Sequence, residues 1–159
     1  MLNRKWPLFG LTMATIVVLD LVTKAWAVRT LEFGHTVALL GVPMTLTFNT
    51  GAAFSLSVGD ASRWFFLCTN TIALGAMLVF FHRTELTNKA QLVALTLLSS
   101  GAVGNIIDRI RWEHGVVDFI GPINLGVMFW PVFNLADSAI TCGALLLAAA
   151  LWRSDRHAE

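Results

Sequence analysis

The stretch Ala90–Ile107, AQLVALTLLSSGAVGNII, decides the class of fold, because it is long, apolar and free of Asp, Glu, Lys and Arg. A bilayer core about 30 Å thick needs about 20 mostly apolar residues for each spanning helix. Three more stretches are long and apolar: Trp64–Phe81, which is equally free of these residues, Trp6–Val28, which contains Asp20 and Lys24, and Pro131–Trp152, which contains Asp137. We therefore predict a single membrane domain over residues 1–159, with an all-α core of four transmembrane helices at about 6–28, 64–81, 90–107 and 131–152.

The composition of the chain supports a membrane protein. Of its 159 residues, 56% are hydrophobic and 13% are charged, whereas a typical soluble domain has about 25% charged residues. The net charge of +1 provides no polycationic surface, so we expect no nucleic-acid partner. The high hydrophobicity also excludes intrinsic disorder. Cys68 and Cys142 lie in apolar runs, and we interpret them as small hydrophobic residues.

The first apolar run has an alternative interpretation as a secretory signal. Arg4 and Lys5 precede it, and Ala25-Trp26-Ala27 has the small-x-small form of a cleavage site. Asp20 inside the run, and the three apolar runs that follow it, favour a retained helix.

Tryptophans mark the ends of the predicted spans, as in the aromatic belts of membrane proteins. All six lie at such ends: Trp6, Trp26, Trp64, Trp112, Trp130 and Trp152. Basic residues divide almost evenly between the two sides, and the short N-terminal flank carries Arg4 and Lys5. Because that flank usually dominates orientation, we predict that both termini are cytoplasmic.

Two segments are too rich in glycine and proline to be helices. Residues 29–63 contain two candidate strands, Thr36–Leu40 and Met44–Phe48, with a Gly-Val-Pro turn between them. Residues 112–130 include the apolar, interrupted piece Phe119–Trp130. We predict a small extracytoplasmic β platform from the first segment and an apolar periplasmic surface loop from the second. Such irregular backbone needs protein or water around it, so the two could clamp a site at the bilayer edge.

Ionisable and polar residues in the spans follow helical spacing. Asp20 and Lys24 are four residues apart and can form an ion pair. Two polar stripes are predicted to meet between the third and fourth helices. They consist of Gly101, Gly104, Asn105 and Asp108 on the third, and of Asn134, Asp137, Ser138 and Thr141 on the fourth. Packing alone could explain the asparagines.

The carboxylates point to chemistry rather than packing. Asp137 has no basic neighbour within a turn of its own helix, so an ionised side chain there would be costly to bury. Asp118, just before the apolar loop, is a plausible second carboxyl. Two carboxyls a few ångströms apart share one proton, which is the working state of an aspartic peptidase. The sequence does not determine which of them holds that proton.

Two other chemistries have weaker support. His114 and Asp118 are four residues apart, but the remaining histidines are scattered and no His-Glu-x-x-His occurs. A serine nucleophile lacks both a Gly-x-Ser-x-Gly motif and a histidine base near Ser138.

Five blocks in this order resemble the bacterial lipoprotein signal peptidases, also called signal peptidase II. They cover nearly the whole chain: 20-DLVTK-24, 49-NTGAAFS-55, 101-GAVGNIIDR-109, 116-VVDF-119 and 133-FNLADS-138. Leu21 departs from the family pattern, which commonly has glutamine after the aspartate.

The resemblance implies an aspartic endopeptidase of the bacterial inner membrane, acting at the extracytoplasmic face on prolipoproteins whose cysteine already carries diacylglycerol. Asp118 and Asp137 look like the catalytic dyad, and cleavage would fall just before the lipidated cysteine. The implied substrate-binding residues are Asn49, Gly51, Asn105, Arg109 and Asn134, and the implied supporting residues are Asp20, Lys24, Asp108 and Ala136. No metal or other cofactor is implied, and we expect a monomer in contact with membrane lipid. We also expect the loop and the β platform to hold the signal peptide extended.

Three other functions compete with this one. An intramembrane protease of the presenilin type would need Gly-x-Gly-Asp, which is absent. A small polytopic protein whose buried aspartates serve as a proton or ion relay is the main alternative, although no internal repeat is evident. In a structural subunit the polar stripes would only join helices.

Overall fold

The structure is a computed structural model that describes residues 5–51 and 62–155. It contains four long helices: α1 (Lys5–Thr30), α2 (Ser62–Arg83), α3 (Lys89–Arg111) and α4 (Leu135–Asp155). Each is long and apolar enough to cross a membrane. The predicted core of four apolar helices is therefore confirmed.

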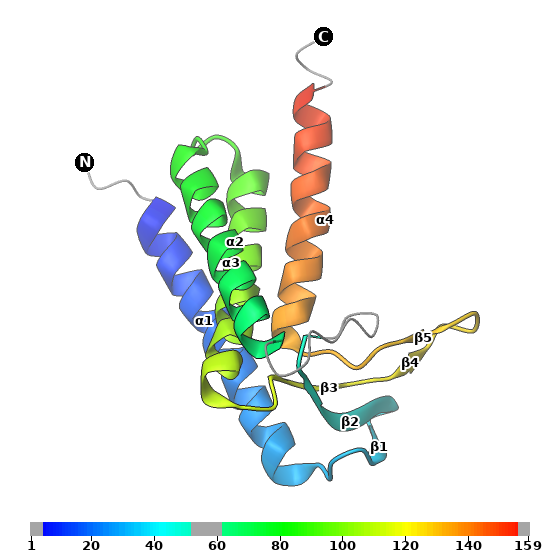
Figure 1. Cartoon of the computed structure of the whole chain (residues 1–159). Coiled ribbons are helices and arrows are strands. Elements are labelled where there is room, and N and C mark those ends of the chain that lie inside the picture. The colour runs from blue at the N-terminus through cyan, green and yellow to red at the C-terminus, as the bar shows by residue number, and fades with distance from the viewer. Residues whose placement is uncertain (1–4, 52–61, 156–159) are drawn as a thin grey trace.

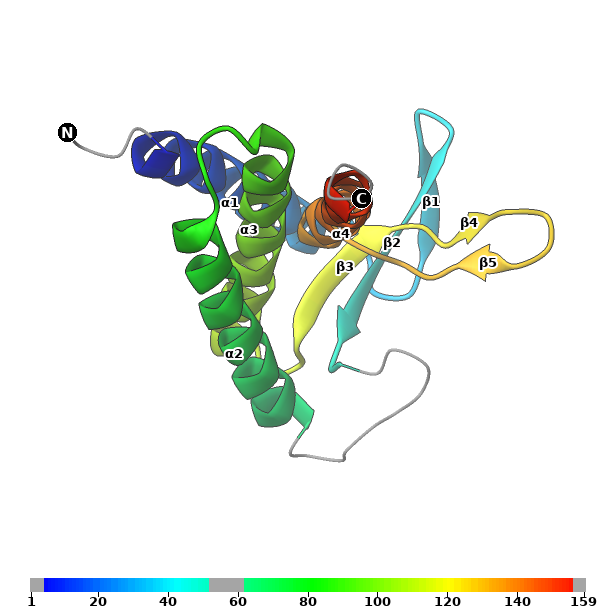
Figure 2. The same ribbon diagram turned by 90° about the horizontal axis from the view of Figure 1, so that it is seen from above.

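Helix α3 is the centre of the bundle and packs against α1, α2 and α4 (Figure 2). More than half of its apolar span is buried, whereas the spans of the other three helices are mostly exposed. Large apolar side chains such as Leu11, Ile72 and Leu145 are about two-thirds exposed or more. Those three helices therefore present apolar surface that suits contact with lipid tails.

The strands lie at one end of the bundle, opposite the start of α1 and the end of α4 (Figure 1). An antiparallel sheet has the order β1 (Thr36–Leu39), β2 (Val42–Asn49) and β3 (Val116–Ile120). A second, two-stranded sheet is the hairpin of β4 (Ile123–Asn124) and β5 (Phe129–Trp130). The sheet β1-β2-β3 brings residues near position 48 beside residues near position 117.

The turn of the first hairpin differs from the predicted Gly-Val-Pro turn. It consists of Leu40 and Gly41, with φ of 51° and 83°, and Val42 and Pro43 already pair with β1. Two central residues with positive φ match the right-handed twist of the flanking strands. Within the predicted platform 29–63, the two strands thus lie between residues 36 and 49. Residues 52–61 of the predicted platform lie outside the part of the chain that the structure describes.

The structure differs from the predicted surface loop over Phe119–Trp130, because that segment contains strands, and the fourth helix, predicted from about 131, begins four residues later. Phe119 and Ile120 belong to β3, and the rest contains the β4–β5 hairpin. Phe133 is extended and exchanges two backbone hydrogen bonds with Ile120, at 2.8 and 2.9 Å. This pairing keeps Pro131–Phe133 out of the helix, which begins at Leu135.

Candidate functional site

Asp118 lies in β3, opposite Thr47 of β2, and is almost completely buried. Its Oδ1 accepts a hydrogen bond of 2.7 Å from the Asn134 amide, and the Asn49 side chain also hydrogen-bonds to its carboxyl. Gly115 makes this close approach possible, because a Cβ there would lie 2.2 Å from the Asn49 carbonyl oxygen. Strand β3 can thus begin directly against the end of β2.

Asp137 lies in the first turn of α4, where it forms a capping box with Asn134. The Asp137 N–H donates to Asn134 Oδ1 at 2.8 Å, and the Asn134 N–H donates to Asp137 Oδ2 at 3.3 Å. This reciprocal pair fixes both the start of α4 and the position of the Asp137 carboxyl. Asp137 is only half-buried, unlike Asp118.

Two asparagine amides connect the carboxyls. Asn105 on α3 donates from Nδ2 to Asp137 Oδ1 at 2.8 Å, and its Oδ1 accepts from Asn134 Nδ2 at 3.2 Å. Asn134 therefore contacts Asp118, Asp137 and Asn105 together. The two polar stripes meet as their spacing predicts, since α3 and α4 pack together along them.

Burial and the nearby charge of Asp137 raise the pKa of Asp118 to about 7. The hydrogen bonds from Asn49 and Asn134 lower this pKa, but by less. Removal from water disfavours a carboxylate more strongly than these bonds stabilise it. At neutral pH Asp118 therefore keeps its proton in about half of the molecules, far more than an aspartate with the ordinary value of 3.8 would.

Arg109 adds a buried positive charge beside the two carboxyls. It interacts electrostatically with Asp137 and Asp118, donates from Nη1 to its own helix at the Asn105 carbonyl, and lies over the Phe66 ring. Its buried Nε has no hydrogen-bond partner in the described part of the chain.

An ion network lies behind the site, and all four of the predicted supporting residues belong to it. Lys24 Nζ is 2.8 Å from Asp20 Oδ2 and 2.8 Å from Asp108 Oδ2, so the predicted Asp20–Lys24 pair is present. Asp20 Oδ1 accepts from the Ala136 N–H at 2.9 Å. Asp108 accepts from the Val117 N–H at 3.1 Å, next to Asp118. The network thus holds the backbone beside each carboxyl of the site.

Gly51 has a local structural role. Its N–H donates to Asn49 Oδ1 at 2.8 Å, and a Cβ there would lie 1.9 Å from the Phe66 ring, at a φ of 108°. The residue therefore fixes the Asn49 side chain and leaves room for Phe66.

A cleft of about 740 Å³ opens beside Asp137 and Asn49. Its walls are mostly apolar: Phe129, Trp130, Pro131, Val132 and Phe133 form one side, and Ser138, Thr141 and Cys142 of α4 continue the other. Thr141 and Cys142 are exposed on the flank of the helix, so the cleft extends toward the surface that would face lipid. Ser138 and Thr141 belong to the predicted polar stripe, and Phe129 and Trp130 belong to the predicted surface loop, whereas Val132, Phe133 and Cys142 were not predicted to line a site.

Comparisons with known proteins agree with this picture. Residues 12–153 match the family described as Signal peptidase (SPase) II. A lipoprotein signal peptidase of Francisella tularensis subsp. novicida is 40% identical over 139 residues, covering 85% of each chain. One of Geobacter metallireducens is 38% identical over 155 residues, covering 96% of this chain and 94% of its own.

Two solved structures, each described as a bacterial membrane enzyme, share the fold. The first has a TM-score of 0.85 at 33% identity and covers 97% of this chain and 93% of its own. The second has a TM-score of 0.81 at 34% identity, with coverages of 92% and 93%.

Proposed function

This chain belongs to the signal peptidase II family and is a lipoprotein signal peptidase of a bacterial membrane, and we propose that Asp118 and Asp137 are its catalytic dyad. One observation supports this proposal most directly. Asn134 hydrogen-bonds to both carboxyls, one buried in β3 and the other lining the cleft. Two aspartates from separate segments thereby share Asn134 as a hydrogen-bonding partner.

The different surroundings of the two carboxyls suggest their roles. Asp118 is the protonated partner near neutral pH, because its pKa is raised to about 7. Asp137, half-exposed in the cleft, then acts as the general base. It takes a proton from a water molecule while the water oxygen attacks the carbonyl carbon of the scissile amide. Asp118 gives its proton to the carbonyl oxygen.

The resulting tetrahedral intermediate then breaks down, and the two carboxyls exchange roles: Asp137 donates a proton and Asp118 accepts one. The proton on Asp137 passes to the amide nitrogen as the carbon–nitrogen bond breaks, which releases an amine. Asp118 recovers a proton from a hydroxyl of the intermediate, which becomes the new carboxyl group. The dyad returns to its starting state with one shared proton.

The remaining predicted residues orient the dyad and the substrate. Asn105 holds Asp137 through a charge-assisted hydrogen bond, and Asn134 holds Asp118 through a hydrogen bond of 2.7 Å. The buried Arg109 Nε has no hydrogen-bond partner among residues 5–51 and 62–155, and we assign Arg109 to the peptide or to the negative charge that develops on the scissile carbonyl. Asn49, positioned by Gly51, lines the cleft and can hydrogen-bond to the peptide backbone.

The substrate is a prolipoprotein, in keeping with the family, and we propose that it enters already modified with diacylglycerol. A substrate anchored by acyl chains stays in the bilayer, so its site must open sideways. The cleft does so along Thr141 and Cys142. The edge of β3 beyond Asp118 already bonds to Phe133, so the extended peptide would lie between Asn49 and Pro131–Phe133 rather than add to that edge.

We also propose the orientation predicted from the sequence, with both termini in the cytoplasm and the sheets and cleft at the extracytoplasmic face. The start of α1 and the end of α4 lie at the same end of the bundle, opposite the sheets (Figure 1). The short basic N-terminal flank then faces the cytoplasm.

The test is a cleavage assay with purified protein and a prolipoprotein carrying diacylglycerol. Asp118→Asn and Asp137→Asn should each abolish cleavage, because neither amide can exchange the required proton. Glu113→Gln is the matched control: it removes an exposed carboxyl five residues from Asp118 and should cleave at the wild-type rate. Normal cleavage by either aspartate variant would disprove the dyad.

A second arm of the assay tests the lipid requirement on its own. Wild-type protein should cleave the unmodified precursor far more slowly than the modified one. Equal rates would overturn the proposed lipid dependence and leave the dyad intact.

A further inference from the structure

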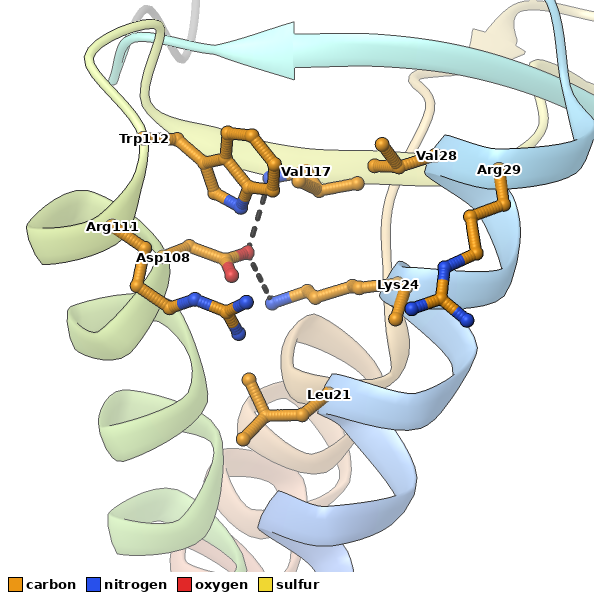
Figure 3. Close-up of a pocket in the computed structure, with 9 residues that line it drawn as sticks. Leu21, Lys24, Val28, Arg29, Asp108, Arg111, Trp112 and Val117 are labelled. Atoms are coloured by element: carbon orange, nitrogen blue, oxygen red, sulfur yellow. Dashed lines mark hydrogen bonds and ion pairs between the residues drawn. The ribbon is translucent and has the colours of Figure 1, made fainter.

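A second pocket, of about 140 Å³, lies between α1 and α3 near β3 (Figure 3). Leu21, Ala25 and Val28 line it from α1, and Asp108 and Trp112 from the end of α3. It shares no lining residue with the cleft beside Asp137. The proposed peptidase chemistry makes no use of it.

Two arginines flank this pocket from facing helices. Figure 3 shows Arg111 of α3 extending into the space between the helices and Arg29 lying along α1. Both are exposed, and neither has an acidic partner within 4 Å among residues 5–51 and 62–155. Their bidentate donor groups are thus available to an outside ligand.

The charge balance of the pocket favours a single anion. Lys24 is already paired with Asp20 and Asp108 at 2.8 Å each. These three residues together carry one negative charge, to which Arg29 and Arg111 add two positive charges. The local sum is +1, and one monovalent anion would bring it to zero.

The surroundings indicate which anion. The pocket lies where the spanning helices meet the sheet, at the depth expected of lipid headgroups, and Trp112 on its wall is typical of that depth. On the side of α1 that carries Arg29, Val22 and Val18 are 61% and 57% exposed and lie about two and about three turns farther into the span than Arg29. A ligand with a charged head and apolar tails fits this arrangement, because the head would lie in the pocket and the tails along the exposed valines.

We propose that this pocket binds the phosphate of an anionic phospholipid headgroup. The Arg29 and Arg111 guanidinium groups donate to the phosphate oxygens, while the acyl chains follow Val18 and Val22. Because Asp108 also accepts from the Val117 N–H, a bound headgroup would brace the junction of α1, α3 and β3 next to Asp118. The proposal depends on the helices spanning a bilayer and not on the peptidase mechanism.

Native mass spectrometry of the full chain in detergent can test this site. The protein is titrated with dioleoylphosphatidylglycerol, with dioleoylphosphatidylcholine as a lipid of zero net charge, and with inorganic phosphate. We expect phosphatidylglycerol to bind most tightly. The double variant Arg29→Gln/Arg111→Gln should bind it about thirty-fold more weakly, since it removes two cations that each contribute on the order of 1 kcal/mol near a lipid surface, and about 1.4 kcal/mol corresponds to ten-fold in affinity.

Arg83→Gln is the matched control, because it removes an exposed arginine from the other end of the bundle. It should bind phosphatidylglycerol as the wild type does. Equal weakening by Arg83→Gln, or equal retention of both lipids by the wild type, would overturn the proposal. Binding of inorganic phosphate as tight as that of phosphatidylglycerol would identify a soluble phosphate site instead and would overturn the lipid assignment. The readout is binding alone, so it is independent of whether the proposed dyad is correct.

Discussion

Asn134 combines a local structural role with a place in the candidate site. Its side-chain oxygen caps α4 by accepting from Asp137, and its amide nitrogen donates to Asp118 at 2.7 Å. A serine could cap the helix equally well but has no amide to donate across to β3. Asparagine at position 134 therefore links the start of α4 to the hydrogen bonding of the Asp118 carboxyl in β3.

Asp118 provides a prediction at the same scale, because its raised pKa has a cost in stability. Below about pH 4 the carboxyl is protonated in both the folded and the unfolded chain. Between the ordinary value of 3.8 and about 7 only the folded chain keeps the proton, so the free energy of unfolding falls as the pH rises through this window. Above about pH 7 the full cost is present.

We therefore expect Asp118→Asn to be inactive yet more stable than the wild type at pH 8, by up to about 4 kcal/mol. The difference should narrow by pH 5. Thermal unfolding in detergent at the two pH values measures it, with Glu113→Gln as a control that should track the wild type. A variant that is less stable than the wild type at pH 8 would contradict the assigned burial cost.

Among the elements, the contact between α3 and α4 determines the geometry of the site. Gly101 permits it, because a Cβ there would lie 2.3 Å from the Ala136 carbonyl oxygen and 2.6 Å from the Ile140 side chain. From the other helix, Gly143 similarly approaches the backbone of Ala94. Small residues allow helix backbones to pack this closely in membranes.

Gly101→Ala should push α4 away from α3 and destabilise the protein by about 1–3 kcal/mol, with loss of cleavage because Asn105 and Asp137 separate. Gly75→Ala in α2 is the matched control, since nothing lies within 4 Å of its added Cβ. Alanine should stabilise that helix by roughly 0.5–1 kcal/mol. Equal effects of the two substitutions on thermal unfolding would show that close packing of α3 and α4 is not required.

For the molecule as a whole, the Asp20–Lys24–Asp108 network joins its parts. The Lys24–Asp108 ion pair connects α1 to α3. Asp20, which pairs with Lys24 within α1, reaches α4 through the Ala136 N–H. All three side chains are buried. Removal of one partner leaves an uncompensated buried charge, which costs far more than the ion pair itself contributes.

Lys24→Ala should therefore lower the free energy of unfolding by about 3–5 kcal/mol, while the folded fraction keeps residual peptidase activity. Lys89→Ala, which removes an exposed lysine at the start of α3, should change the unfolding free energy by less than about 0.5 kcal/mol. Complete loss of turnover in well-folded Lys24→Ala would place Lys24 in the catalytic machinery.

The orientation of the whole chain can be tested with single cysteines, after Cys68 and Cys142 are changed to serine. Leu40→Cys, at the 98% exposed tip of the β1–β2 hairpin, should react with a membrane-impermeant maleimide on intact spheroplasts. Leu86→Cys, 52% exposed between α2 and α3, should react only after permeabilisation. The opposite pattern would place the cleft in the cytoplasm.

The sequence by itself determined the four apolar helices, because hydropathy and helical period are properties of contiguous residues. It also determined that the polar stripes of α3 and α4 share faces, and that Asp20 and Lys24 can pair. The start of α4 could also have been read locally, since Asn134 and Asp137 have capping-box spacing. The resemblance of its motifs placed the chain in its family and selected Asp118 and Asp137.

Only the tertiary structure decided which carboxyl is buried, how the segment before α4 pairs with β3, and which arginines line the pocket between α1 and α3. Ile120 and Phe133 bond across a hairpin, and Arg29 and Arg111 come from different helices. Burial and pKa depend on every group packed around a side chain, and here those groups come from segments far apart in the chain. Such contacts exist only once the bundle has formed.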